Sequence, residues 1–128
     1  MNLKRYSKGI QHIGIPTKRM DETVEFYKLL GLEIVYNTIY SDKRVVFLKI
    51  GSLVLEIYED KEAPDNIGAI NHIAIDVYDI EETFSYIQKC DLNKGNDKIH
   101  FLPFWKNGIQ YFTIVGPNEE LIEFCQYM

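Results

Sequence analysis

An internal repeat constrains this chain more than any other feature of its sequence. Residues 10–26 align with residues 70–86 at an offset of 60, and the 17 aligned positions contain six identities. Average residue frequencies would give about one identity by chance. The two halves also end alike, because Leu55-Glu56-Ile57 matches Ile122-Glu123-Phe124. A repeat of this length predicts two copies of one supersecondary unit.

The pattern of apolar residues assigns the same five elements to each half. Runs of branched and aromatic residues indicate strands, and apolar residues at helical spacing between 20 and 30 indicate a helix. The first half has a predicted strand at 10–16, a helix at 20–30 and strands at 32–40, 44–50 and 53–58. The second half has a predicted strand at 70–77, a helix at 80–90 and strands at 98–104, 109–115 and 120–126. The sequence therefore predicts an α+β fold of two βαβββ modules.

Turn and cap residues support these boundaries. Gly31 follows the first predicted helix at the position of a helix-terminating glycine. Asp79 and Glu82 have the spacing of a capping box at the start of the second helix. Gly51-Ser52 joins two strand-like runs as a tight hairpin turn. The 128 residues fit one domain, residues 1–128, with module one at about 9–60 and module two at about 69–127.

Composition and charge exclude several classes of function. Lys and Arg number 14 against 19 Asp and Glu, a net charge of −5, and no basic cluster offers the face that nucleic acid requires. The longest apolar runs have about four residues, whereas a membrane helix needs about 20. No apolar segment of a signal peptide follows the basic start of the chain, and Cys90 and Cys125 form no CxxC spacing. The sequence predicts a cytoplasmic protein whose cysteines are small buried hydrophobes.

Strand alternation separates two faces in each predicted sheet. Side chains two apart in a strand point the same way, so His12 shares a face with Gly14, and His72 shares a face with Ala74. Glu56 and Glu123 lie on the corresponding faces of the closing strands. The opposite faces carry the residues expected to be buried beneath the two helices: Ile13, Ile15, Leu55, Ile57, Ile73, Ile75, Ile122 and Phe124.

The His and Glu residues form a candidate set of metal ligands. Taken singly, a strand His is more often a hydrogen-bonded residue and a strand Glu is usually solvent-facing. Here both residue types recur at matching places in both halves, beside small residues that leave room for a ligand. His12, Glu56, His72 and Glu123 supply N and O donors suited to one divalent ion of Zn, Ni, Co, Fe or Mn.

Five stretches carry a resemblance to a known family. They are Ile10-Gln11-His12-Ile13-Gly14-Ile15, Glu25-Phe26-Tyr27-Lys28-Leu29-Leu30-Gly31-Leu32, Leu55-Glu56-Ile57, Asn71-His72-Ile73-Ala74-Ile75 and Gly116-Pro117-Asn118-Glu119-Glu120-Leu121-Ile122-Glu123. Over about residues 9–127 the chain resembles the vicinal oxygen chelate superfamily, which includes glyoxalase I, methylmalonyl-CoA epimerase, extradiol dioxygenases, and the fosfomycin and bleomycin resistance proteins. The resemblance implies paired βαβββ modules whose sheets form an open cup around a metal, with the helices on the outer face.

The ligand set favours one branch of that superfamily. Glyoxalase I-like enzymes use four protein ligands, matched here by His12, Glu56, His72 and Glu123. Extradiol dioxygenases and fosfomycin-type transferases lack the acidic ligand at the Glu56 position, and epimerases usually carry Gln there. The resemblance therefore implies a glyoxalase I-like lyase or isomerase, related to lactoylglutathione lyase. A methylmalonyl-CoA epimerase-like isomerase and a non-catalytic small-molecule binding or resistance protein are the alternatives.

The resemblance also implies a mechanism. In such enzymes the metal stabilises an enediolate while a carboxylate moves a proton next to a carbonyl. Glu123 corresponds to the base and Glu56 to its near-symmetric counterpart, and either Glu can serve. The implied substrate is a thiol adduct of a 2-oxoaldehyde or a related oxo compound. The implied assembly is a homodimer, with the cup built within one chain or shared between two.

Two positions depart from glyoxalase I. Pro16 replaces an arginine that binds a glutathione carboxylate, and Asp60 replaces an asparagine contact. The resemblance to glyoxalase I therefore includes the metal ligands but not the residues that bind glutathione. Among the remaining candidates, Tyr58, Tyr111, Phe104 and Trp105 either line the cup or pack as ordinary aromatic residues. His100 has no counterpart in the first half and is expected at the rim or surface.

Overall fold

A computed structural model describes residues 3–128. The chain divides into two compact units, Met1–Ala63 and Pro64–Met128, which contain the two predicted modules and are called module one and module two from here on. Module one contains a short 3-10 helix at Leu3–Arg5, then β1 (Ile13–Thr17), α1 (Met20–Leu29), β2 (Glu33–Tyr40), β3 (Lys43–Ile50) and β4 (Leu53–Glu59). Module two contains β5 (His72–Asp76), α2 (Ile80–Lys89), β6 (His100–Leu102), β7 (Ile109–Val115) and β8 (Leu121–Tyr127). The predicted α+β repeat of two βαβββ modules is confirmed. Within residues 3–128, no helix has the length and apolar character needed to cross a membrane.

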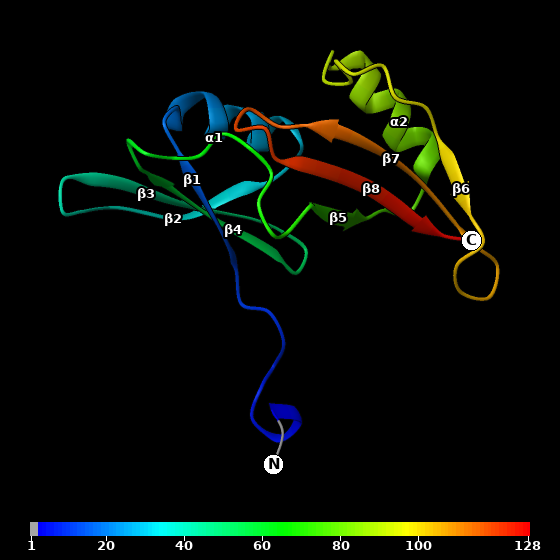
Figure 1. Cartoon of the computed structure of the whole chain (residues 1–128), viewed down its shortest axis with the longest axis horizontal. Helices are drawn as coiled ribbons and strands as arrows, with labels where there is room; N and C mark the ends of the chain where they lie inside the picture. The colour runs from blue at the N-terminus through cyan, green and yellow to red at the C-terminus, as the bar shows by residue number, and fades with distance from the viewer. Residues whose placement is uncertain (1–2) are drawn as a thin grey trace. The chain divides into compact units, whose positions relative to one another are not determined.

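The two sheets have the same topology. The strand order is β1-β4-β3-β2 in module one and β5-β8-β7-β6 in module two. In each sheet the first strand pairs in parallel with the last, and the other pairings are antiparallel. The helix connects the first strand to the outer strand, and it lies across one face of its own sheet (Figure 1). The other face of each sheet carries the predicted His and Glu residues.

Equivalent threonines form a hydrogen bond in the first turn of both helices. Thr23 and Thr83 are identical positions of the repeat, and their hydroxyls donate to the carbonyls of Arg19 and Asp79 at 2.8 and 2.7 Å. The predicted cap of the second helix is also present, because the Asp79 carboxylate accepts from the Glu82 backbone N–H at 3.0 Å. The N-terminal N–H groups of a helix have no partner within the helix, and the Asp79 carboxylate supplies one for α2, so this contact fixes where that helix begins.

Both helices end in the same way. In α1 the Gly31 N–H donates to the Lys28 carbonyl and the Leu32 N–H to the Tyr27 carbonyl, both at 3.0 Å. This pair of bonds is a Schellman motif, and its terminating residue must adopt a left-handed conformation. Gly31 has a φ of +105°, as expected from the sequence. In α2 the equivalent residue is Asp91, with a φ of +56°.

We expect Gly31→Ala to lower the free energy of unfolding by about 1–2 kcal/mol, because a Cβ is strained at this φ. The nearest atom to that Cβ is 3.5 Å away on Ile50, so the loss reflects the backbone and not a clash. Gly95→Ala is the control, since its φ lies outside the left-handed region and the space around it is open. Urea unfolding of the two variants measures the difference. Equal stability of both variants would contradict this account of the helix end.

The core agrees with most of the expected buried face. Ile15, Leu55, Ile57, Ile122 and Phe124 are buried. Ile13, Ile73 and Ile75 were expected to be buried as well, but they are only half-buried. The helices pack mainly on other strands, α1 on β3 and β4 and α2 on β7 and β8, so the edge strands β1 and β5 are covered less completely, although Ile15 of β1 is still buried.

Three strands are clearly shorter than predicted. β1 begins at Ile13 instead of residue 10, β5 covers His72–Asp76 instead of 70–77, and β6 covers three residues instead of 98–104. Just before β6 the side chain of Asp97 accepts from the Thr113 backbone N–H at 2.9 Å, where a longer strand would place a backbone carbonyl. The ladder therefore ends at His100, which pairs with Tyr111. Cys90 and Cys125 also differ from expectation, since both are half-buried free thiols.

Candidate metal centre

In module one, His12 and Glu56 come together at the edge of the sheet. His12 directly precedes β1, and its Nε2 lies 3.4 Å from Oε1 of Glu56 in β4. Gly14 is the neighbour of Glu56 across the parallel pair. A Cβ built on Gly14 would lie 3.7 Å from that carboxylate oxygen and 3.4 Å from the Tyr58 ring. The small residue at this position therefore leaves the carboxylate room, as the sequence predicted.

In module two, His72 and Glu123 repeat this arrangement. His72 is the first residue of β5, and its Nε2 lies 3.8 Å from Oε1 of Glu123 in β8. Ala74 is the neighbour of Glu123 across the parallel pair, as Gly14 is for Glu56. The Glu123 side chain is 16% exposed and the Glu56 side chain 29% exposed. Glu123 is thus the less hydrated of two equivalent carboxylates.

A side-chain amide contacts the other ring nitrogen of each histidine. His12 Nδ1 lies 2.8 Å from Gln11 Oε1, and His72 Nδ1 lies 3.0 Å from Asn71 Oδ1. Neighbouring side chains in a pleated strand point to opposite faces. In module one both Gln11 and His12 lie outside the ladder, and in module two Asn71 lies outside it while His72 is the first residue of β5. Neither Gln11 nor Asn71 was assigned a role from the sequence, although an amide precedes the histidine in both halves of the repeat.

The distances and donor types within each pair suit a divalent metal. Two ligand atoms that lie about 2.1 Å from one ion at a tetrahedral angle are about 3.4 Å apart. The His12–Glu56 separation of 3.4 Å matches this value, and the His72–Glu123 separation of 3.8 Å is slightly wider. With Nδ1 donating to an amide oxygen, Nε2 carries a lone pair directed toward a carboxylate. Two lone pairs at this distance repel each other unless a cation lies between them.

The groups around Glu123 give this part of the sheet a negative electrostatic character. Asp76 and Cys125 lie on the same face of the module-two sheet as Glu123, and Asp76 pairs with Cys125 across the ladder. Partial burial, together with the Glu123 and Asp76 carboxylates, raises the pKa of the Cys125 thiol above its ordinary value. The four strands of module two contain no Lys or Arg. This face therefore favours a cation.

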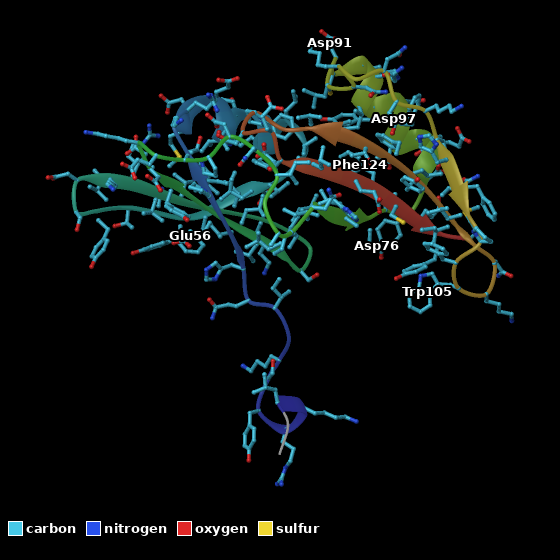
Figure 2. The ribbon with its side chains drawn as sticks, in the orientation of Figure 1. Glu56, Asp76, Asp91, Asp97, Trp105 and Phe124 are labelled. Atoms are coloured by element: carbon cyan, nitrogen blue, oxygen red, sulfur yellow. The ribbon has the colours of Figure 1, made fainter. Side chains whose placement is uncertain are left out.

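Each module brings together two of the four predicted ligands. Within residues 3–128, neither module gathers three or more His, Cys, Asp or Glu side chains that could hold an ion alone. Figure 2 labels Glu56 on the face of its sheet opposite α1, and Asp76 on the face of its sheet opposite α2. The pairs thus lie on the open faces of their sheets and not beneath the helices, as strand alternation predicted.

His100 belongs to a separate polar cluster on the Glu123 face of module two. Its Nε2 bonds to Asp97 Oδ1 at 2.7 Å, and its ring lies over Tyr111 with 5.2 Å between ring centroids. The other Asp97 oxygen accepts from the Thr113 N–H at 2.9 Å. The His100 side chain is 34% exposed, so this residue of β6 is half-buried and not simply a surface residue. No local pattern predicted the role of Asp97, because its partners lie three and sixteen residues away.

We expect Asp97→Ala to lower the free energy of unfolding at pH 7 by about 2 kcal/mol, since it removes charge-assisted hydrogen bonds that close the loop before β6. Partial burial alone raises the pKa of this carboxyl, but its hydrogen bonds to the His100 ring and to two backbone amides outweigh burial and lower the pKa. A lowered pKa contributes stability above the unfolded value of about 3.9, and this stability is lost as the pH falls through the folded pKa. Unfolding curves of both proteins should therefore converge as the pH falls below about 4. Asp21→Ala, at an exposed ion pair with Arg44, is the control and should cost under about 1 kcal/mol. A difference that persists unchanged to pH 2 would contradict the role of the ionised carboxylate.

The remaining aromatic and loop candidates differ in their exposure and in the residues that they contact. Tyr58 is half-buried beside Gly14, and Pro16 is its neighbour across the ladder. Trp105 is 75% exposed, has a φ of +64°, and packs edge-on against Tyr127. In Figure 2 it lies on the side of the module-two sheet opposite α2. Phe104 is exposed, and Asp60 lies in the loop after β4, where it accepts from the Glu62 N–H.

Comparison with known proteins places the chain in a family. Residues 9–97 match the model of the Glyoxalase/Bleomycin resistance protein/Dioxygenase superfamily. A curated relative, the uncharacterized protein YwbC of Bacillus subtilis (strain 168), is 27% identical and covers 94% of this chain and 98% of its own length.

Solved structures share the fold. A glyoxalase family protein from Enterococcus faecalis has a TM-score of 0.74 at 21% identity, covering 94% of this chain and 98% of its own. The fosfomycin resistance protein FosX from Listeria monocytogenes, complexed with Mn(II) and sulfate ion, has a TM-score of 0.67 at 18% identity, covering 95% and 94%. The duplicated βαβββ topology and the family match agree. The chain belongs to the glyoxalase/bleomycin resistance protein/dioxygenase superfamily, the vicinal oxygen chelate superfamily that its sequence resembles.

Proposed function

We propose that this protein is a metal-dependent, glyoxalase I-like lyase or isomerase that moves a proton between carbons next to a carbonyl. His12, Glu56, His72 and Glu123 would together hold one divalent ion, and Mn(II) is a reasonable first choice because the FosX neighbour is complexed with it. The observation that carries the proposal is the duplicated His–Glu pair, at 3.4 and 3.8 Å, on the open face of each sheet. When bound, the metal would polarise the substrate oxygens and offset the negative charge that develops on them.

The two glutamates have different proposed roles in the reaction. Glu123 takes a proton from the carbon next to the carbonyl and returns it to the neighbouring carbon, so that the carboxylate is regenerated. We assign this role to Glu123 because it holds the position that corresponds to the base in the resemblance, and because it is the less exposed of the two carboxylates. Glu56 occupies the equivalent position in module one and serves mainly to bind the ion.

The proposed substrate is a small thiol adduct of a 2-oxoaldehyde, or a related oxo compound, other than the glutathione adduct. Pro16 offers no charge to a glutathione carboxylate, and the strands of module two contain neither Lys nor Arg. Asp60 would repel such a carboxylate. A substrate with an uncharged or cationic thiol portion suits these faces better.

The proposed assembly is a homodimer. All eight residues of the edge strand β2 are exposed, including the large apolar residues Ile39 and Tyr40 at 70% and 75%. An apolar edge strand favours association with another chain. Sedimentation equilibrium should give twice the 15.0 kDa chain mass, and a single-chain mass would contradict the dimer.

The test of the function combines metal analysis with a proton-exchange screen. The purified protein is loaded with Mn²⁺ and supplied with methylglyoxal adducts of glutathione, cysteine and cysteamine in D₂O. Loss of adduct absorbance and deuterium incorporation at carbon are followed together. The proposal predicts turnover of at least one small-thiol adduct, faster than that of the glutathione adduct, and only with metal. Metal binding without turnover or exchange of any adduct would contradict the lyase and favour a binding protein. Exchange of the α-proton of methylmalonyl-CoA alone would favour an epimerase.

A further inference from the structure

Both candidate ligand histidines are contacted by the residue that directly precedes them. Gln11 Oε1 lies 2.8 Å from His12 Nδ1, and Asn71 Oδ1 lies 3.0 Å from His72 Nδ1. These are hydrogen-bond distances, and the acceptor is a carbonyl oxygen of a side-chain amide in both modules. The two amides differ in length by one methylene, yet both reach the same ring atom. The contact is therefore a property of the repeated unit.

The contact with the amide oxygen determines which ring nitrogen of the histidine carries the proton and which offers a lone pair. A neutral imidazole carries one N–H, and the nitrogen without it offers a lone pair. In each pair the nearby carboxylate attracts a proton on Nε2, because Glu56 lies 3.4 Å and Glu123 lies 3.8 Å from that atom. An Nε2–H histidine bonded to its own carboxylate cannot bind a metal through Nε2. The amide oxygen opposes this outcome, since it stabilises the proton on Nδ1 instead.

We propose that Gln11 and Asn71 are positioning residues that hold His12 and His72 as Nδ1–H tautomers, so that both Nε2 lone pairs are available to the metal. The inference rests on the proposed function for its metal role, but the tautomer itself belongs to the metal-free protein. An outer hydrogen bond of this kind fixes the ring orientation and raises the basicity of a metal-binding imidazole. The module-one ring has further support, because its edge packs on Phe47 at 5.6 Å between ring centroids.

The variants Gln11→Leu and Asn71→Leu remove the acceptor with little change in side-chain size, and Gln11→Glu and Asn71→Asp restore an acceptor oxygen. Gln88→Leu, at an exposed position of α2, controls for an added surface leucine. Two quantities are measured: the imidazole tautomer, by nitrogen-15 NMR of the metal-free protein at pH 8, and the Co²⁺ affinity, by absorbance titration. Neither depends on turnover.

We expect both histidines of the unaltered protein to be Nδ1–H. Each Leu variant should shift its own histidine toward Nε2–H and lower the Co²⁺ affinity by roughly tenfold, and the double variant by roughly a hundredfold. The Glu and Asp variants should retain the Nδ1–H tautomer and bind Co²⁺ at least as tightly as the unaltered protein. Gln88→Leu should change neither quantity.

Two results would overturn the inference while leaving the proposed function intact: Nε2–H histidines in the unaltered protein, or Leu variants that bind Co²⁺ with undiminished affinity. If the unaltered protein binds no Co²⁺, Zn²⁺ or Mn²⁺, the proposed function fails, and the metal role of the two amides fails with it. Nδ1–H spectra in that case would identify the failure as one of the metal site and not of the tautomer.

Discussion

Glu123→Gln is expected to lower kcat for the best adduct by about 10²–10⁴-fold, the range that a positioned general base contributes. Glutamine keeps a carbonyl oxygen that can ligate a metal, but it cannot accept a proton at neutral pH. The effect should therefore fall on kcat more than on metal affinity. Because Glu123 lies on the open face of its sheet and glutamine has nearly the same shape, the substitution should change the unfolding midpoint only slightly.

Glu56→Gln provides the matched comparison at the equivalent position. We expect a kcat decrease of roughly tenfold or less, because the proposed role of Glu56 is to bind the ion and an amide oxygen can still do so. Glu81→Gln, at an exposed position of α2, should leave kcat unchanged. The reverse order of the two site variants would assign the base to module one. Full activity of Glu123→Gln would remove the carboxylate base from the proposed reaction.

Removal of metal should abolish turnover and lower thermal stability together. A ligand present at about 100 times its Kd stabilises the folded state by about 2.7 kcal/mol. For a chain of this size that corresponds to a Tm change on the order of 10 °C. Scanning calorimetry with excess Mn²⁺, and then with a chelator, measures the change, and renewed Mn²⁺ should restore both Tm and activity.

Two histidine variants make the metal-removal test specific. His72→Ala should lose the response of Tm to Mn²⁺, because it removes a proposed ligand. His100→Ala should keep the response, because His100 bonds to Asp97 and not to a proposed ligand pair. A Mn²⁺ response that survives in His72→Ala would show that the metal binds elsewhere.

The topology and the faces of the sheets were predictable because they follow from short-range regularities. The repeat gave the same element order twice, alternation put Glu56 and Glu123 on the faces opposite the helices, and Gly31 identified the helix end. Alternation and the helix end depend on residues within a few positions of one another, and the repeat shows the same local pattern twice. Backbone chemistry constrains them strongly, so the pattern in the sequence was sufficient.

The features that escaped prediction depend on side chains that replace backbone contacts. Asp97 ends the β6 ladder by accepting from the Thr113 N–H, sixteen residues away, and no local pattern signals that bond. The Gln11–His12 contact lies in a segment that precedes the β1 ladder, which begins at residue 13. Ile73 and Ile75 obey alternation, but how far a helix covers an edge strand depends on packing that alternation does not describe.

In the proposed metal centre the two His–Glu pairs bind one ion together, and a Co²⁺ titration distinguishes this from separate sites. The titration is done on the unaltered protein and on His12→Ala, Glu56→Ala, His72→Ala and Glu123→Ala, with the bound metal counted by elemental analysis. We expect one ion per chain and a loss of affinity of at least about tenfold in every one of the four variants. Two ions per chain, or undiminished affinity when the pair of one module is altered, would contradict it.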